Sequence, residues 1–541
     1  MNGSSFYSRA IPGFFIVIAA ALVLGGQYIN RSLWEPDEAR YTYVAKEMSE
    51  AGSWFVPLRN GEPYAHKPPL MFWLINAGTW FTNGEFNGVS GRLPSFLGTV
   101  LSLLALWWLA CLWYNRQIAL YSVLILSTSL LFWLEAGYGQ IDMLFLVMEL
   151  QAIYIIFKND NNPYIVGFAL AFSLMGLGVL AKGPVGLIVP IGIYASVTLI
   201  SGNKKNLFKR YWLWGIPLAL AWPAAWLFMA WLSGAPSEYF NELLFAQNVG
   251  RLSGEFGGHN RPFYYYLKYL VIDFMPWTLL VPGALIAYKK NDANGFSGRR
   301  IIGWVVFVVL FFSLSHSKRN LYILSVYPAL SMFLASTLAY WEDLSSRWRV
   351  AVVYPLVICL VILALAGVAL MFPFTAMPVT IPWPILACFS AILGVSAAVL
   401  FFNQGSGGIT RPWIHLLIAV LIVLEFYVGT FALPAFNGVK SPTDLAQVVE
   451  TILPKDRKLI LYRLHGEIIA LYSRRSGDRI DDFSELTQSM KKTEFGIVAC
   501  SKQEWESLQQ DLLKVNCHVS PHFFTMGSKN LMWFEYRCNG L

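Results

Sequence analysis

The chain has 541 residues, of which 56% are hydrophobic and only 13% are charged, and its mean hydropathy is +0.50. Soluble domains carry about 25% charged residues, so this composition excludes a soluble globular protein and indicates a polytopic membrane protein. The net charge of +8 would suggest nucleic acid in a soluble protein. Here the distribution of Lys and Arg between loops explains it better, and no nucleic-acid partner is expected.

The first apolar run covers residues 11–29, and about 20 residues are enough to cross a membrane. It follows a short polar start and has no convincing small-residue cleavage site, so it is expected to be a retained span. Further apolar runs lie near 94–114, 118–136, 142–157, 163–181, 184–200, 211–232, 269–288, 301–315, 321–340, 350–372, 382–402 and 412–433. The pattern therefore predicts about 13 transmembrane helices.

Two kinds of loop alternate between these runs. The short and mostly basic loops are 115–116, 158–162, 201–210, 289–300, 341–349 and 403–411. The positive-inside rule places them in the cytoplasm together with the N-terminus. The other loops, 30–92, 135–141, 181–184, 233–268, 315–320 and 372–381, are then outside. An odd number of spans puts the tail on the outer side as well.

The loop 30–92 holds acids, bases and prolines between two apolar regions, in WEPDEARYTYVAKEM and GEPYAHKPPLMFW. A charged segment of this length cannot lie in hydrocarbon, so it must lie on one face of the membrane. A solvated loop is the simplest interpretation of any single charge. The crowding of acidic, basic and aromatic side chains in one loop favours a functional site instead.

The composition changes at about residue 437, which divides the chain into a transmembrane domain, 1–436, and a tail, 437–541. Strand-like runs at 458–462, 494–500 and 530–536 alternate with helix candidates at 467–473 and 502–513. This predicts a small α/β domain on the outer face. No Gly-rich loop follows a strand, so no nucleotide is assigned to it, and a cap or scaffold is its simplest role.

The six cysteines have no metal-ligand spacing. Cys111, Cys359 and Cys388 lie in apolar runs and are expected to pack there. The tail has three more, so at most one disulfide forms among them, and the pair Cys517–Cys538 is favoured over a bridge to Cys500.

The outer loops collect ionisable residues, which runs against the positive-inside trend and points to a bound anion. Lys67, Arg251, Arg261 and Lys318 are candidates to neutralise a phosphate. Asp37 or Glu38 could take a proton from an acceptor hydroxyl. This combination is typical of transfer of a group from a phosphate leaving group.

Asp142 and Lys182 stand at membrane edges, where an ionisable group is either functional or paired. A structural salt bridge between the two is as reasonable as a role in a site. An anion transporter would use similar residues, but it would place them near the midplane and often show inverted repeats, which are absent from this sequence.

The stretch WEPDEARYTYVAKEMSEAGSWFVPLRNGEPYAHKPPLMFW resembles the first periplasmic loop of the bacterial aminoarabinose transferases of lipid A, a family related to the protein O-mannosyltransferases. The similarity continues through ID at 141–142, AKG at 181–183, HNRPFYYY and the stretch 318–325. It implies the type C glycosyltransferase fold. It also implies a donor sugar on undecaprenyl phosphate and an acceptor outside the inner membrane.

The resemblance implies roles for particular residues. Asp37 would be the catalytic carboxylate. The substrate-binding residues would be Arg40, Tyr41, Tyr64, His66, Lys67, Asp142, Lys182, Arg251, His259, Arg261, Lys318 and Tyr322.

Two departures from the family concern a metal. His66 stands where the aminoarabinose transferases carry Glu, and Gln247-Asn248 replaces Glu-His. No metal ligand is therefore assigned. A divalent metal held by His66 and His259 remains a candidate cofactor, with a hydrogen-bonding histidine the commoner alternative.

The expected function is transfer of a sugar, 4-amino-4-deoxy-L-arabinose by resemblance, from undecaprenyl phosphate to lipid A or another envelope glycan. The expected location is the bacterial inner membrane, in contact with membrane lipid and with the site facing the periplasm. A protein O-glycosyltransferase that uses a polyprenyl phosphate sugar is the nearest alternative. A lipid or anion transporter is the alternative from another class.

Overall fold

The structure is a computed structural model. It describes residues 30–538 except 162–163, 203, 248–249, 251–260, 291–294, 340–345, 373–381, 403–411, 516 and 527–528, and before residue 30 only Gly25, Gln27 and Tyr28. The expected first span, 11–29, therefore lies almost entirely outside the described residues.

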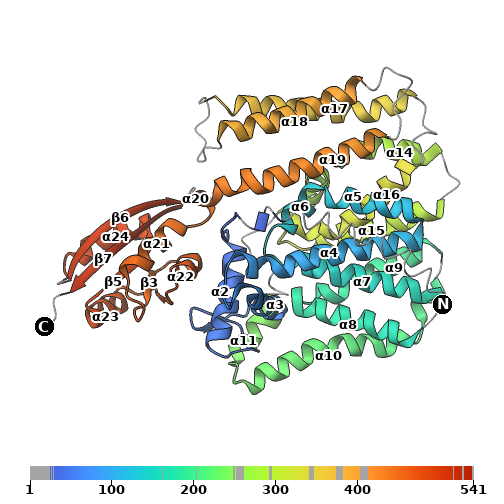
Figure 1. Ribbon diagram of the computed structural model, residues 1–541. Helices are drawn as coiled ribbons and strands as arrows, with labels where there is room; N and C mark the ends of the chain where they lie inside the picture. Colours follow the sequence, from blue (N-terminus) through green and yellow to red (C-terminus); the bar gives the residue numbers. More distant parts are fainter. Residues whose placement is uncertain are drawn as a thin grey trace.

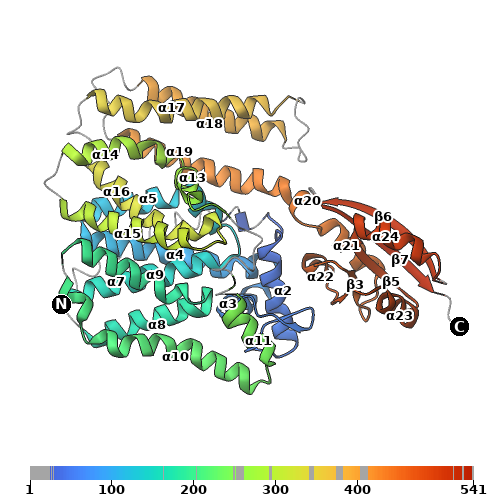
Figure 2. The ribbon, with the colours of Figure 1, turned by 180° about the vertical axis from the view of Figure 1, so that it is seen from behind.

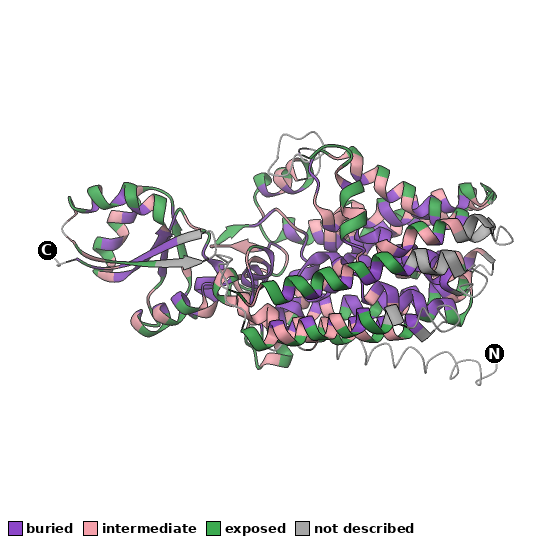
Figure 3. Cartoon of the chain, turned by 90° about the horizontal axis from the view of Figure 1, so that it is seen from above, coloured by how far each residue is buried: buried purple, intermediate pink, exposed green. Residues whose placement is uncertain are grey.

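Long apolar helices form a bundle that makes up most of the molecule (Figure 1). Its helices are α4 (Gly88–Trp113), α5 (Arg116–Ser127), α6 (Leu130–Ala136), α7 (Ile141–Asn161), α8 (Ile165–Lys182), α9 (Val185–Ile200), α10 (Tyr211–Leu232), α13 (Tyr265–Ile272), α14 (Val281–Lys290), α15 (Gly295–Leu314), α16 (Tyr327–Ala339), α17 (Ser346–Ala369), α18 (Trp383–Phe402) and α19 (Pro412–Tyr427). Buried residues gather in the interior of this bundle (Figure 3).

Five helices among the described residues are long and apolar enough to cross a membrane, or seven if each of two bent helix pairs is one span. The bent pairs are α5 with α6, at 70°, and α13 with the segment Trp277–Ile286, at 96°. Shorter apolar helices lie at Val185–Ile200, Val353–Ala369 and Trp383–Val399. The fold is that of a multi-pass membrane protein, and the total of about 13 spans stays a prediction.

The loop 30–92, which is expected on the outer side and is called the first outer loop here, contains α2 (Asp37–Glu50), the hairpin strands β1 (Leu58–Arg59) and β2 (Glu62–Pro63), and α3 (Leu70–Gly78). Asn60 and Gly61 join the two strands, and both have positive φ, at 56° and 79°. Asn-Gly is the favoured pair for such a turn because both central residues must be left-handed. In both side views α2 lies between the bundle and the tail (Figures 1 and 2).

The tail contains a five-stranded sheet in the order β4-β3-β5-β7-β6. Its elements are α20 (Asn437–Lys440), α21 (Thr443–Ile452), β3 (Leu459–Tyr462), α22 (Glu467–Tyr472), β4 (Gly477–Ile480), α23 (Phe483–Thr493), β5 (Phe495–Ser501), α24 (Lys502–Leu512), β6 (Cys517–Met526) and β7 (Lys529–Cys538). β3 pairs in parallel with β4 and β5, whereas β7 pairs antiparallel with β5 and β6. The three expected strands are thus β3, β5 and β7, and the two expected helices are α22 and α24.

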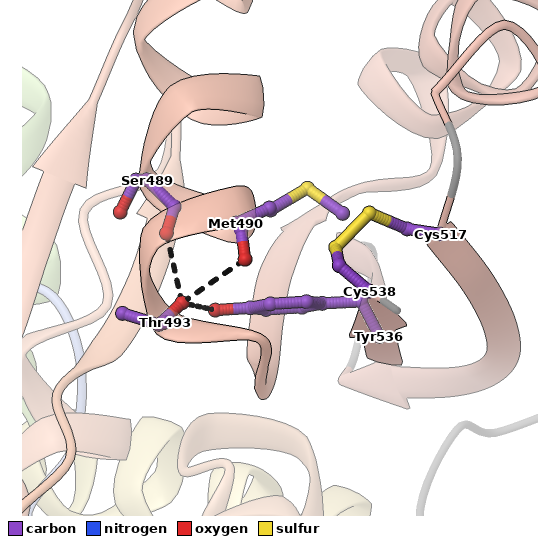
Figure 4. Close-up of a disulfide and its surroundings, with 6 residues drawn as sticks. All are labelled: Ser489, Met490, Thr493, Cys517, Tyr536 and Cys538. Atoms are coloured by element: carbon purple, nitrogen blue, oxygen red, sulfur yellow. Dashed lines mark hydrogen bonds between the residues drawn. A yellow bond between two sulfur atoms is a disulfide. The ribbon is translucent and has the colours of Figure 1, made fainter. Parts of the chain in front are cut away.

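The expected disulfide between Cys517 and Cys538 is confirmed and joins β6 to β7 (Figure 4). Cys500 is buried and free. Nearby, the hydroxyl groups of Thr493 and Tyr536 lie 2.5 Å apart and share a hydrogen bond. The hydrogen bond links the end of α23 to β7, and the disulfide links β7 to β6.

The tail docks on the first outer loop through one side of α22. Leu33 and Tyr43 of the loop form a buried cluster with Ala470 and Leu471 of α22. Arg59 of the hairpin makes an ion pair with Glu467. The ion pair therefore links the hairpin to the tail, just before the segment that contains Tyr64 and His66.

Candidate active site

The start of α2 presents one face to a cavity. Asp37, Arg40 and Tyr41 lie three and four positions apart, which places their side chains on the same side of a helix. Each of the three lines a cavity of about 370 Å³. An acidic side chain in the first turn is also favoured by the partial positive charge of the helix N-terminus.

Asp37 is almost fully buried and is oriented by two guanidinium groups. Arg40 donates to its Oδ1, and Arg319 Nη2 donates to its Oδ2 at 3.0 Å. These charge-assisted bonds hold the carboxylate in one position. Each oxygen keeps a further lone pair for a substrate hydroxyl, because a carboxylate oxygen can accept more than one hydrogen bond.

A second ion pair lies across the cavity, where α7 begins and α8 ends. Lys182 Nζ donates to Asp142 Oδ1 at 2.6 Å, so the salt bridge weighed from the sequence is present. Both residues also line the cavity. The Lys182 ammonium lies 5.1 Å from the centre of the Tyr322 ring, within cation–π range. Asp142 and Lys182 thus form a salt bridge and line the cavity at the same time.

The cavity brings together nine of the residues singled out from the sequence. They are Asp37, Arg40, Tyr41, Tyr64, His66, Lys67, Asp142, Lys182 and Tyr322. They come from the first loop, from two helix ends and from the loop before α16, so segments far apart in the chain meet here. Burial raises the pKa of both Tyr41 and Tyr64, which keeps their hydroxyls neutral donors.

Arg319 is not among the site residues expected from the sequence, yet it lines the cavity and donates a hydrogen bond to Asp37. Its neighbour Lys318 instead donates to the carbonyl oxygens of Arg261, at 3.2 Å, and Ser315, and it does not line the cavity. The backbone at Arg319 is extended, with φ −125° and ψ 145°. Successive side chains in extended backbone point to opposite sides, so only one of this basic pair can face the site.

Of the other expected phosphate ligands, the structure describes only Arg261. Arg261 is exposed and is not part of the cavity wall, although its carbonyl receives Lys318. Arg251 and His259 lie outside the described residues. Among the residues that the structure describes, the cations that line the cavity are Arg40, Lys67, Lys182 and Arg319.

His66 lies at the rim, with Nε2 3.0 Å from Glu242 Oε1. No group of three His, Cys, Asp or Glu side chains that could hold a metal is found in the part of the chain that the structure describes. His66 contacts Glu242 in this way, and His259, the other candidate metal ligand, lies outside the described residues.

Glu38, the alternative candidate for the base, is buried in a network of ion pairs and hydrogen bonds and does not line the cavity. Its fully buried carboxylate accepts from Arg31 and Arg92, each at 2.8 Å, and from the backbone N–H groups of Trp34 and Gly139. Burial alone would raise the pKa of Glu38, but the Coulombic attraction of Arg92 and Arg31 outweighs it and lowers the pKa to about 2. The network ties α2 to α4 and to the turn before Asp142.

Known proteins are similar to this chain in sequence and in fold. Residues 66–231 match the family model of dolichyl-phosphate-mannose-protein mannosyltransferases. The undecaprenyl phosphate-α-4-amino-4-deoxy-L-arabinose arabinosyl transferase of Pectobacterium carotovorum is 32% identical over 318 residues, which cover 57% of this chain and 55% of that protein. Its counterpart in Yersinia pestis is 29% identical over 349 residues, 63% of this chain and 60% of that protein.

The similarity in fold covers almost the whole chain. ArnT from Cupriavidus metallidurans, in a crystal structure bound to undecaprenyl phosphate, superposes with a TM-score of 0.76 at 19% identity and covers 96% of this chain and 97% of that chain. The chain is thus similar to the bacterial aminoarabinose transferases in sequence over just over half of its length, and shares the fold of ArnT. The archaeal oligosaccharyltransferase AglB from Archaeoglobus fulgidus is a more distant neighbour, with a TM-score of 0.51 and 13% identity over 91% of this chain and 70% of that chain.

The resemblance inferred from the first loop is confirmed by these matches, as is the polytopic type C glycosyltransferase fold. The sequence match spans just over half the length of the curated aminoarabinose transferases. The match in fold, which covers 96% of this chain, includes the tail.

Proposed function

We propose that this chain is an inner-membrane glycosyltransferase that moves 4-amino-4-deoxy-L-arabinose from undecaprenyl phosphate to lipid A or a related envelope glycolipid. The observation that carries the proposal is the buried carboxylate of Asp37 in a cavity that is also lined by Asp142 and by the cations Arg40, Lys67, Lys182 and Arg319. A lipid phosphate reaches such a position from the membrane without leaving its hydrocarbon tail in water. The identity of the sugar and of its lipid carrier is inferred from the names of the similar proteins.

The reaction is a single displacement. The acceptor oxygen forms a bond to the anomeric carbon of the sugar while the bond from that carbon to the phosphate oxygen breaks. Asp37 takes the proton of the acceptor hydroxyl, and the electron pair of the broken bond leaves with undecaprenyl phosphate. Arg40, Lys67, Lys182 and Arg319 stabilise the charge that develops on the phosphate. Ion pairs with Asp37 or Asp142 hold Arg40, Lys182 and Arg319 in position before the reaction.

The proposed orientation places the cavity and the tail, residues 437–541, in the periplasm. Basic loops at the other ends of the helices support it through the positive-inside rule. No nucleotide sugar is needed in this arrangement, because the activated sugar arrives on the lipid carrier.

The test uses purified protein in lipid vesicles with undecaprenyl phosphate aminoarabinose and lipid A, and acceptor mass as the readout. A mass gain of one aminoarabinose with release of undecaprenyl phosphate is the expected result. Transfer to a polypeptide instead would favour the protein O-glycosyltransferase alternative, which the match to protein mannosyltransferases makes the second candidate. Movement of lipid without cleavage of the phosphodiester would identify a transporter.

Lys67 is expected to contribute directly to donor affinity. It follows His66 in the wall of the cavity and lies opposite the Asp142–Lys182 pair. A hydrogen bond to a charged group is worth about 1.5–3 kcal/mol, so Lys67→Ala should weaken binding of undecaprenyl phosphate about 10- to 100-fold. Binding is measured by titration of the purified protein with undecaprenyl phosphate.

Lys46→Ala is the matched control for this measurement. Lys46 lies on α2 outside the cavity and pairs with Glu50 at 3.8 Å. Its removal should leave the donor affinity unchanged. Equal affinities in wild type and Lys67→Ala would place the phosphate at another group of cations.

A further inference from the structure

The segment 32–35, which leads into α2, forms neither helix nor strand, so its backbone groups need hydrogen-bond partners elsewhere in the chain. Three of its four backbone N–H groups donate to the tail. The bonds run from Ser32 to Asn437 Oδ1 at 3.2 Å, from Leu33 to Tyr472 Oη at 2.7 Å, and from Glu35 to the carbonyl oxygen of Lys440 at 3.2 Å. The tail is therefore the main hydrogen-bonding partner of the chain that enters α2.

Asn437, the first residue of α20, contributes three of the bonds to this part of the chain with one side-chain amide. Besides the bond from Ser32, its Oδ1 accepts from the indole Nε1 of Trp34 at 3.0 Å, and its Nδ2 donates to the carbonyl oxygen of Asn30 at 3.1 Å. In both side views α20 lies where α19, the last helix of the bundle, meets the tail (Figures 1 and 2). Asn437 thus connects this junction to the segment before α2.

Trp34 passes this connection on to the first turn of α2. It is only 4% exposed, and its backbone N–H donates to Glu38 Oε2 at 2.8 Å. Its ring lies 4.5 Å from the guanidinium of Arg31, which is also bonded to Glu38. Asp37 is the neighbour of Glu38 and the first residue of the helix. The place of Trp34 therefore helps to set the place of Asp37.

The position of Asp37 matters because its two partners belong to different parts of the chain. Arg40 lies on α2 and moves with Asp37, whereas Arg319 comes from the loop before α16 and donates to Asp37 Oδ2 at 3.0 Å. A shift of the first turn would separate Asp37 from Arg319 and from the acceptor hydroxyl. The ion pair between Glu38 and Arg92 would still hold α2 against α4, so such a shift would not unfold the loop.

We propose that Asn437 is a positioning residue for Asp37, and that the tail thereby takes part in the reaction through the segment 32–35. The inference rests on the proposed function. Asn437 does not line the cavity that contains Asp37, so it acts through Ser32 and Trp34 rather than on a substrate. This assigns to the start of the tail a role beyond that of a cap or scaffold.

The experiment measures steady-state transfer by wild type and Asn437→Ala, with undecaprenyl phosphate aminoarabinose and lipid A in vesicles. Asn437→Ala removes all three bonds and should lower kcat about 10- to 100-fold, as expected when a catalytic group is misplaced by about 1 Å. The KM for lipid A and the Kd for undecaprenyl phosphate should stay within about 2-fold of wild type, because a positioning effect appears in kcat.

Asn437→Asp is the conservative variant. It keeps an oxygen that accepts from Ser32 and Trp34, and it loses only the donor to the exposed Asn30. Its kcat should return to within about 3-fold of wild type, since one exposed hydrogen bond contributes little. A general loss of stability would not be repaired in this selective way.

Tyr472→Phe tests the same segment from α22. It removes the hydroxyl that accepts from Leu33 and keeps the ring, so the tail still folds and kcat should fall with donor affinity unchanged. Arg474→Ala is the matched control, because Arg474 Nη2 also bonds to the first outer loop, 2.9 Å from Glu85 Oε1, but away from the segment 32–35. Its kcat should equal that of wild type.

The outcomes separate this inference from the proposed function. A wild-type kcat in both Asn437→Ala and Tyr472→Phe, with transfer by the wild type intact, would overturn the positioning role and leave the proposed function standing. A kcat that falls together with donor affinity, or that falls equally in Arg474→Ala, would show a general disturbance of the loop and equally overturn it. Absence of transfer by the wild type would overturn the proposed function, and this inference with it.

Discussion

Asp37→Asn is expected to reduce the rate of sugar transfer by about 10²- to 10⁴-fold, the usual contribution of a general base. Asn has the size of Asp and can still accept a hydrogen bond from Arg40 or Arg319, the two partners of the carboxylate. It cannot take a proton from the acceptor hydroxyl. The rate is measured as acceptor mass gain per time at saturating donor and acceptor.

Glu47→Gln is the matched control, because Glu47 lies on the same helix but outside the cavity. It accepts from the backbone N–H of Gly61 at 3.3 Å, and its loss should leave the rate near that of wild type. Donor affinity measured in Asp37→Asn shows whether the site is intact. Wild-type transfer by Asp37→Asn would remove this carboxylate from the mechanism.

Glu38→Gln is expected to destabilise the folded chain by about 3–5 kcal/mol, the cost of breaking a buried ion pair by removing one partner. The neutral amide leaves Arg31 and Arg92 buried beside each other without a counter-charge. The free energy of unfolding, or the thermal midpoint of the purified protein in detergent, is the measurement. Loss of activity in this variant should follow the loss of folded protein.

Two comparisons test the explanation for Glu38. Glu50→Gln removes a carboxylate that is 60% exposed and pairs loosely with Lys46, so it should cost less than about 1 kcal/mol. Glu38 has a pKa of about 2 in the folded chain, below its ordinary value of 4.5. The stability that its ion pairs contribute is therefore complete above pH 4.5 and is lost as the pH falls toward 2. A Glu38→Gln variant as stable as wild type would show that the arginines find other partners.

Part of this molecule follows from the sequence because the causes are local. Hydropathy alone identifies the long apolar helices of the bundle, since about 20 apolar residues are what a bilayer requires. The spacing of three and four residues between Asp37, Arg40 and Tyr41 places their side chains on one face of a helix. The short apolar runs in the tail predict β3, β5 and β7 correctly, because these strands are buried almost continuously in the sheet.

Other features could not be read from the sequence. The strands β4 and β6 are largely polar or exposed, so their pairing is decided by the neighbouring strands and not by their own pattern. Lys318 and Arg319 are adjacent bases of similar charge, and only the path of the backbone decides that Arg319 faces Asp37.

The same holds for the two carboxylates at the start of α2. Asp37 and Glu38 are neighbours in the chain, and both carry a carboxylate that could serve as a base. The sequence by itself determined that a membrane-embedded bundle carries acids and bases in its first outer loop. Tertiary structure decided their roles: Arg31 and Arg92 come from before and after α2 and neutralise Glu38 in the interior, which leaves Asp37 at the cavity. Long-range contacts set burial and charge balance, and these decide which carboxylate can meet a substrate.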